Sequence, residues 1–180
     1  IEGLATNNPQ DPNLNKMLDY AYNIFVNGIT RDEYINEIGT PDAKSVMWSD
    51  SIEQPATYKS TISNSLYVTA GSRLAKLIKF RYGENNPKYN YPKVLNDTKL
   101  VADGYFLGCF EQIESNGLLM DGITTKGLSK STPQSGDVIK YIFTYNQGAV
   151  LPGMAILTQL TGKAKYLDFA KNLIQASYDT

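Results

Sequence analysis

The side chains that could carry chemistry in this 180-residue sequence are carboxylates, amides, hydroxyls and amines, because it has no His and a single Cys. The absence of His excludes Ser-His and Cys-His catalysis, His-based zinc sites and His general bases. Cys109 cannot form an internal disulfide or a multi-cysteine cluster. On an apolar helix face, Cys109 is typical of a small buried side chain rather than a nucleophile. Polar chemistry therefore has to come from carboxylates, amides, hydroxyls, Lys, Arg and Tyr.

Two short segments place such side chains at informative spacings. Asp50 and Glu53 are three residues apart and could share one face of a helix, although an exposed capping segment explains them as well. The run Tyr145-Asn146-Gln147-Gly148 places an aromatic ring beside two amides, and each amide can both donate and accept hydrogen bonds. A structural alternative for this run is that Asn146 caps the N-terminus of a helix.

Charge and composition exclude several classes of protein. The sequence has 17 Lys and Arg against 18 Asp and Glu, a net charge of −1, so it predicts no basic surface for nucleic acid or an anionic membrane. With 42% hydrophobic and 19% charged residues, the chain is typical of a folded domain. No apolar run is long enough to predict a membrane span, and no signal peptide is visible. No metal and no cofactor are expected.

The spacing of apolar residues predicts helices joined by long loops, which is typical of an all-α fold built of helical hairpins. The first helix is predicted from Asp11-Pro12 to Asn27-Gly28. Further helices are predicted over residues 55–80, 92–114, 147–160 and 163–177, and Pro152 suggests that the fourth begins later than drawn. Residues 29–55 and 118–136 are predicted to be loops, the second with short extended pieces. Residues 138–143 have the composition of a strand.

A weak internal repeat supports stacked hairpins. Residues 16–25 and 165–174 carry the same residue at half of their ten positions, namely Lys, Leu, Asp, Ala and Asn. The distance between the two segments is about three units of 50 residues, each roughly the size of a two-helix hairpin. The repeat predicts a toroid or superhelix. The alternative is that these residue types are common on amphipathic helices.

Three segments resemble glycoside hydrolase family 76, the endo-α-1,6-mannanases. The most specific is residues 143–176, where the Tyr145-Asn146-Gln147-Gly148 turn opens a helix and a Thr161-Gly162 turn precedes Tyr166-Leu167. The run Tyr58-Lys59-Ser60-Thr61-Ile62-Ser63-Asn64 is similar to the family's Lys-Asn-x-Ile-Ser-Asn segment, with Ser in place of the usual Asn. Asp121-Gly122 matches the short loop that precedes the Tyr-Asn-Gln-Gly turn, and Trp48 stands where the family often has Trp.

The resemblance implies an (α/α)6 toroid whose inner helices line a groove that binds α-mannan. Catalysis in the family belongs to two consecutive Asp residues in an Asp-Asp-x-x-Trp motif, one acting as nucleophile and the other as acid/base in a retaining mechanism. This sequence has no consecutive Asp pair. Retaining hydrolysis needs two carboxyl groups about 5–5.5 Å apart, and Asp50, Glu53 and Asp121 offer no obvious replacement.

We therefore expect no catalytic residue in this chain and place the Asp pair upstream of it. The predicted helices form fewer hairpins than a closed toroid of this type needs. Residues 1–180 are accordingly interpreted as a single but incomplete portion of the toroid domain, inactive alone, and closed by a missing segment or a partner chain.

The residues expected to bind substrate are polar or aromatic side chains of the matched segments: Trp48, Lys59, Asn64, Asp121, Tyr145, Asn146 and Gln147. Each has a structural alternative. Trp48 and Tyr145 could stack on a pyranose ring or pack in the core. Lys59 and Asn64 could contact the ligand or anchor a neighbouring loop. Asp121 could line the groove or serve as a turn residue.

Three functions follow from this interpretation. The first is an α-1,6-mannanase that hydrolyses α-mannan, the second a non-catalytic glycan-binding or cell-wall transglycosylase-like relative. The third is a helical interaction module without glycan affinity, which predicts an exposed apolar face. The resemblance implies a polysaccharide or oligosaccharide partner and an extracellular, cell-surface or periplasmic location.

Overall fold

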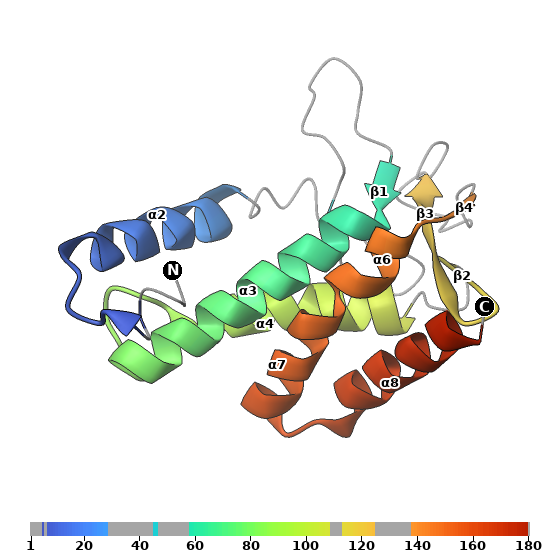
Figure 1. Cartoon of the computed structure of the whole chain (residues 1–180). Helices are drawn as coiled ribbons and strands as arrows, with labels where there is room; N and C mark the ends of the chain where they lie inside the picture. The colour runs from blue at the N-terminus through green and yellow to red at the C-terminus, as the bar shows by residue number, and fades with distance from the viewer. Residues whose placement is uncertain are drawn as a thin grey trace, which may run out of the picture.

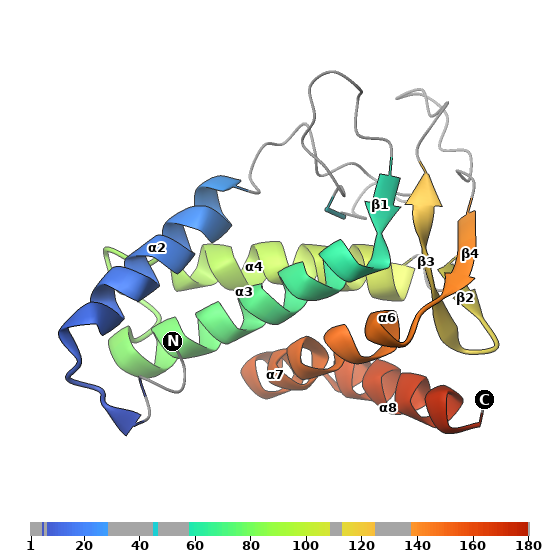
Figure 2. The same cartoon turned by 45° about the horizontal axis from the view of Figure 1, so that its top comes forward.

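The computed structural model describes residues 5, 7–28, 45–46, 58–108, 113–124 and 138–179 (Figure 1). Helices dominate these residues, which confirms the expected all-α fold, and a small sheet stands at one end of the helical layer (Figure 2). Trp48, Asp50, Glu53, Cys109 and nearly all of the predicted loop over 29–55 lie outside the described residues. None of the described helices is long and apolar enough to cross a membrane.

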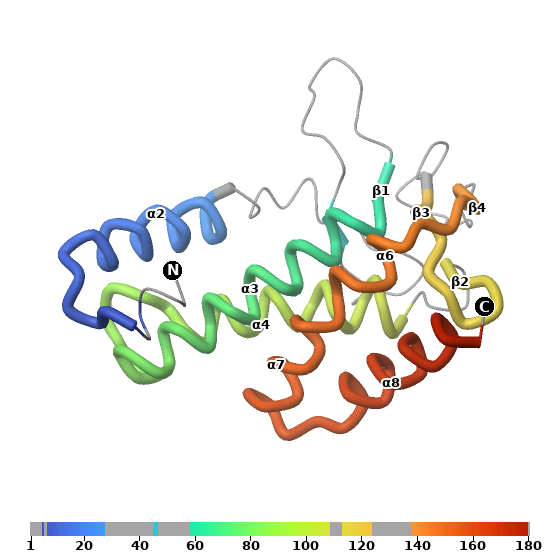
Figure 3. The backbone as a smooth tube through the Cα atoms, in the orientation of Figure 1, coloured from blue at the N-terminus to red at the C-terminus, as the bar shows by residue number. Residues whose placement is uncertain are grey.

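Helix α3 (Thr61–Tyr82) is the central element of the helical layer. It begins after Ser60, whose hydroxyl accepts a hydrogen bond from the Ser63 N–H at 3.2 Å, and it ends at Gly83, where φ is 78°. It packs against α4 (Tyr91–Val101) and against α7 (Leu151–Thr161) (Figure 3). Helix α3 therefore holds the middle of the chain against its C-terminal part.

Helices α7 and α8 (Ala164–Tyr178) form an antiparallel hairpin (Figure 1). The turn between them contains Gly162 with φ of 69°, in the left-handed region that glycine adopts at little cost. A short helix, α6 (Thr144–Ala149), leads into α7. The predicted helix over 147–160 is therefore two helices that meet at Val150, because Pro152 lies in the first turn of α7, where a proline can begin a helix but not continue one.

The sheet is built around strand β3 (Leu118–Thr124), which pairs antiparallel with three others. These are β1 (Tyr58–Ser60), β2 (Glu114–Ser115) and β4 (Val138–Ile142). The strand predicted over 138–143 is confirmed. The extended pieces predicted within 118–136 correspond to β3 at its start, which is one continuous strand of seven residues. The predicted helix over 55–80 is wrong at 58–60, because the backbone there pairs with β3.

The helix predicted over 92–114 is confirmed over 92–108 but changes its geometry on the way, and it is wrong at Glu114. Helix α4 gives way to a wider π-helix, η1 (Ala102–Gly108), and Glu114–Ser115 is already strand β2. The turn from β2 to β3 is Asn116-Gly117, with φ of 53° and 79°. Asn-Gly between two strands is the strongest short-range signal for a β-hairpin, and this signal was missed in the sequence.

The repeat between residues 16–25 and 165–174 is helical in both places, but the two helices bury different, adjacent faces. Helix α2 (Pro12–Gly28) buries Leu18 and Phe25, whose counterparts in α8, Leu167 and Ile174, are exposed. Conversely, α8 buries Tyr166, Phe169 and Leu173, whose counterparts Met17, Tyr20 and Ile24 in α2 are exposed. Each helix therefore has two apolar faces and covers only one of them within the described residues.

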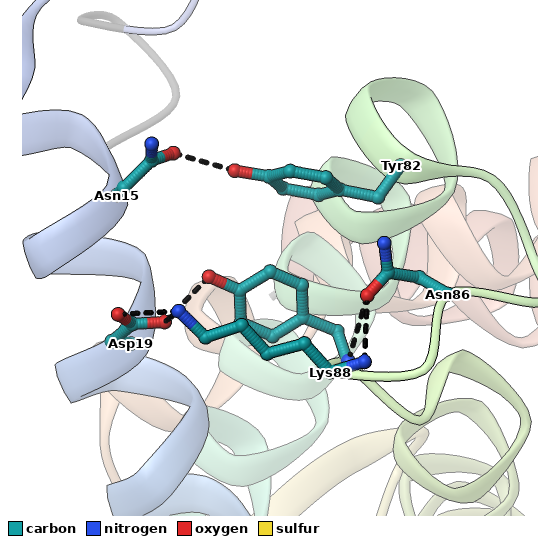
Figure 4. Close-up of polar contacts among 6 residues, drawn as sticks. Asn15, Asp19, Tyr82, Asn86 and Lys88 are labelled. Carbon is teal, nitrogen blue, oxygen red and sulfur yellow. Dashed lines mark hydrogen bonds and ion pairs between the residues drawn. The ribbon is translucent and has the colours of Figure 1, made fainter.

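Polar contacts dock α2 on the end of α3 and on the connection to α4 (Figure 4). The Lys88 ammonium lies 2.6 Å from one carboxylate oxygen of Asp19, and the Tyr89 hydroxyl donates to Asp19 at 2.5 Å. The Tyr82 hydroxyl donates to Asn15 at 2.5 Å (Figure 4). On the apolar side of α2, the ring of Phe25 stacks on Tyr67 at 4.7 Å. The Asp19 carboxylate therefore receives two of the polar contacts that hold α2.

We expect acid to weaken this docking. The hydrogen bonds from Lys88, first, and from Tyr89 hold the pKa of Asp19 below its usual value. A carboxyl group whose pKa is lower in the folded than in the unfolded protein stabilises the fold above the unfolded value, about 4, and this stabilisation is lost as pH falls through the folded value. Asp19→Asn should therefore lower the urea midpoint at pH 7, and the two proteins should converge near pH 2.

The control is Asp168→Asn, at the equivalent position of the repeat, where the side chain is exposed. It should leave the urea midpoint unchanged at both pH values. A midpoint of Asp19→Asn that equals that of the unsubstituted chain at pH 7 would contradict the role given to Asp19.

Candidate functional site

A carboxylate surrounded by neutral donors lies where β1, β3 and α6 meet. Asp121 on β3 is half-buried, and three side chains donate to its carboxylate. The Tyr58 hydroxyl donates to Oδ2 in a short hydrogen bond. The Tyr145 hydroxyl and the Asn146 Nδ2 both lie 3.4 Å from Oδ1. The two carboxylate oxygens thus have different environments, since Oδ2 accepts a short hydrogen bond and Oδ1 has only long contacts.

Both phenols act as donors toward Asp121. Burial, followed by the hydrogen bond to Asp121, raises the pKa of Tyr58 well above its ordinary value. Burial and the nearby Asp121 charge also raise the pKa of Tyr145. The two hydroxyls therefore keep their protons at neutral pH, and within the described residues the carboxylate is held by neutral groups rather than by an ion pair.

Asn146 contributes a buried acceptor to the same cluster. Its side chain is fully buried, and its Oδ1 has no hydrogen-bond partner among the described residues. The opposite orientation of the amide would turn this oxygen toward the Asp121 carboxylate, which is repulsive. An unsatisfied buried acceptor costs about 1–3 kcal/mol, so Asn146 Oδ1 and Asp121 Oδ1 together favour a ligand that brings hydrogen-bond donors. The helix-cap role considered for Asn146 is wrong, because α6 begins at Thr144, two residues earlier, and Phe143 is its N-cap.

Gln147 holds the cluster together. Its Oε1 accepts a hydrogen bond from the Leu119 N–H at 2.8 Å, and its Nε2 donates to the Leu119 carbonyl at 2.8 Å. Nε2 also lies 3.0 Å from the Phe143 carbonyl. The amide thus pairs with β3 as a neighbouring strand would, and it fixes α6 against the strand that carries Asp121.

Asn64 makes the same kind of pairing at the other side of α3. Its Oδ1 accepts from the Val46 N–H at 2.7 Å, and its Nδ2 donates to the carbonyls of Val46 and Ser60 at 3.0 and 2.8 Å. The side chain is fully buried. These contacts favour the loop-anchor alternative for Asn64, since its amide already pairs with the backbone two residues before Trp48.

Lys59 is also fully buried. Its carbonyl accepts a hydrogen bond from the Tyr105 hydroxyl at 3.2 Å. Two residues further on, Thr61 at the start of α3 donates to the Met120 carbonyl at 2.6 Å, so the junction of β1 and α3 is tied to β3 and η1. Lys59 therefore lies inside the protein beside the site rather than on its surface.

The aromatic side chains beside the site are exposed. Tyr141, Phe143 and Tyr145 alternate along β4 and into α6, with exposed fractions of 69%, 38% and 48%. The rings of Phe143 and Tyr145 stack at 5.0 Å with an interplanar angle of 10°. The core alternative for Tyr145 is therefore wrong. Its hydroxyl reaches Asp121, and the exposed part of its ring could pack on a ligand face.

The structure brings together three of the predicted site residues, Asp121, Tyr145 and Asn146. Gln147, Asn64 and Lys59 lie nearby as buried side chains, and Trp48 lies outside the described residues. Tyr58 joins the site although it was not among the predicted residues. Interpreting residues 58–60 as a strand antiparallel to β3 would have brought Tyr58 into range, since Ser60 then pairs with Gly122 and Tyr58 lies two residues further along β1, opposite Thr124.

The family model of glycosyl hydrolase family 76 matches residues 45–180, and the chain belongs to this family. The matched range contains every residue of the Asp121 cluster. No curated protein matches the chain significantly.

Two solved structures share its fold. One is the family 76 α-mannanase BT2949 of Bacteroides thetaiotaomicron, with 18% identity over 74% of this chain and a TM-score of 0.55. The other is Dfg5 of Chaetomium thermophilum in complex with glucosamine, with 21% identity over 82% of this chain and a TM-score of 0.57. The chain spans 31% of the length of each. The described residues are therefore a portion of an α/α toroid, as expected from the sequence.

We expect Gln147→Ala to lower the free energy of unfolding by about 2–4 kcal/mol, because it leaves the buried N–H and carbonyl of Leu119 without partners. Urea unfolding followed by circular dichroism measures the change. Gln159→Ala, an exposed residue of α7, is the matched control and should change stability by less than about 0.5 kcal/mol. Equal effects of the two substitutions would show that the pairing with β3 does not stabilise the fold.

Proposed function

We propose that the protein is a glycoside hydrolase of the α-1,6-mannanase type that acts on α-mannan by a retaining carboxylate mechanism. Family membership supports glycoside chemistry, and the observation that carries the proposal for this chain is the Asp121 cluster beside exposed Tyr145. Sugar hydroxyls are donors as well as acceptors, so they suit an acceptor pair made of a carboxylate and an amide oxygen.

In this proposal the chain positions substrate, and the catalytic Asp pair belongs to a part of the protein outside it. Asp121 Oδ1 and Asn146 Oδ1 accept hydrogen bonds from sugar hydroxyls, while the ring of Tyr145 packs against a pyranose face. Gln147 and Asn64 hold the segments that carry or flank these groups. A retaining mechanism then needs only that the bound sugar be presented to two carboxyl groups about 5–5.5 Å apart.

A non-catalytic glycan-binding or transglycosylase-like function is the second candidate. The likeness to Dfg5, whose structure contains glucosamine, favours it as much as the likeness to BT2949 favours hydrolysis. Turnover separates the two functions. A hydrolase releases reducing ends from linear α-1,6-mannan, whereas a binding protein retains the glycan without hydrolysis.

The site assignment can be tested with the full-length protein and linear α-1,6-mannotetraose. Asp121→Asn and Asn146→Ala should each weaken binding about 10–100-fold in calorimetry, since hydrogen bonds to charged or buried groups contribute about 1.5–3 kcal/mol. The matched control is Asp168→Asn on the exposed face of α8, which should leave affinity unchanged. Unchanged affinity of both site variants would exclude this cluster as the glycan site.

We also propose that further helices of the toroid, from a segment outside this chain or from a partner chain, cover the open faces of α2 and α8. Residues 1–180 would then be an incomplete portion of one domain. Met17 and Ile24 support this, because they are 42% and 50% exposed while their counterparts in α8 are buried. Family membership also supports our proposal of an extracellular, cell-surface or periplasmic location.

The double substitution Met17→Glu and Ile24→Glu tests this closure. It should change the stability of this chain alone by less than about 1 kcal/mol, because exposed positions tolerate polar residues. In the full-length protein it should lower the melting temperature by several degrees, because a helix packed on that face would then bury two charges. Equal behaviour of the two proteins in thermal unfolding would contradict coverage of this face.

A further inference from the structure

We propose that Tyr58 is a positioning residue that holds one oxygen of Asp121 and thereby turns the other toward the bound glycan. This inference rests on the proposed function of the Asp121 cluster and adds the group that controls it. Tyr58 comes from β1, more than 60 residues before Asp121 in the sequence, and reaches the carboxylate across the β1–β3 pairing.

The hydrogen bonds of Asp121 carry the first step. The Tyr58 hydroxyl contacts Oδ2 at short range and lies 3.0 Å from the carbonyl oxygen of the same residue. A carboxylate held at one oxygen cannot rotate freely, so its second oxygen has a defined direction. That direction is toward Tyr145 and Asn146, which lie 3.4 Å from Oδ1. Contacts of this length are weak, and a closer donor from a ligand would replace them favourably.

The close approach of the two strands carries the second step. Gly122 pairs with Ser60, so Tyr58 lies two residues along β1, opposite Thr124. A Cβ atom at Gly122 would lie 2.3 Å from the Lys59 carbonyl oxygen and 2.9 Å from the Tyr58 ring. Only a residue without a side chain lets β1 lie this close, and this closeness brings the Tyr58 hydroxyl back over Asp121. Asp121 and Gly122 thus act together. Asp121 supplies the carboxylate, and Gly122 leaves the space that lets Tyr58 reach it.

The third step is the chemistry of Tyr58, the residue that holds Asp121. A phenol that keeps its proton at neutral pH restrains Asp121 without neutralising it, whereas a Lys or Arg at this place would pair with the charge. The carboxylate therefore remains a full-strength acceptor for hydroxyl groups. Asn146 Oδ1, buried and without a partner among the described residues, stands beside it as a second acceptor.

A double-mutant cycle in the full-length protein tests the inference, with Kd for α-1,6-mannotetraose measured by calorimetry. Tyr58→Phe removes only the hydroxyl and keeps the ring against Gly122, so thermal unfolding should show a folded protein. We expect it to raise Kd about tenfold. Because Tyr58 acts through Asp121, the double variant with Asp121→Asn should bind no more than about twofold worse than Asp121→Asn alone.

Two comparisons make the result specific. Tyr141→Phe, on β4 and 69% exposed, is the matched control and should leave Kd unchanged. Gly122→Ala, which pushes β1 away, should raise Kd about as much as Tyr58→Phe and should likewise add nothing to Asp121→Asn. If the protein turns over mannan, the change should appear in KM with kcat within about twofold, as expected for a group that orients a binding residue.

The outcomes separate this inference from the proposed function. If Asp121→Asn weakens binding but Tyr58→Phe behaves like Tyr141→Phe, the positioning role is overturned and the glycan site stands. If the increases in Kd caused by Tyr58→Phe and by Asp121→Asn multiply in the double variant, Tyr58 acts independently of Asp121 and the inference is also overturned. If Asp121→Asn leaves Kd unchanged, the glycan site and the role of Tyr58 both fail.

Discussion

The pairing of the Gln147 amide with the backbone of Leu119 is the interaction on which the site depends. Helix α6 is only six residues long, and a helix of that length does not stay folded by its own hydrogen bonds. The Gln147 side chain gives it a fixed place by completing the N–H and carbonyl of β3. Tyr145 and Asn146 precede Gln147 directly, so their positions beside Asp121 follow from this one pair of hydrogen bonds.

Asn64 and Gln147 show that the protein uses buried amides where a sheet would use another strand. Each satisfies both backbone groups of one residue in a segment distant in sequence, Val46 for Asn64 and Leu119 for Gln147. An amide can do this because it carries a donor and an acceptor at the spacing of a peptide group. Segments that lack regular partners are thereby held against the helices.

Much of the fold was predictable because its signals are local. The period of apolar residues identified the helices, and the composition of residues 138–143 identified β4. The errors fell where long-range pairing decides the structure. Residues 58–60 extend the helical pattern of α3 in the sequence, yet they form a strand because β3 lies beside them. The Asn116-Gly117 hairpin was a local signal that could have been used and was missed.

The sequence by itself determined the chemistry of this protein and its family. Without His and with one Cys, a polar site had to be built from carboxylates, amides, hydroxyls, Lys, Arg and Tyr, and the Tyr145-Asn146-Gln147-Gly148 turn indicated where. Tertiary structure alone decided which of these residues meet. In the folded chain, the Asn64 and Gln147 side chains form hydrogen bonds with the backbone, and the Tyr58 hydroxyl donates to Asp121. The physical reason is that a polar side chain can bind a ligand or a backbone group, and only the neighbours supplied by folding determine which one it finds.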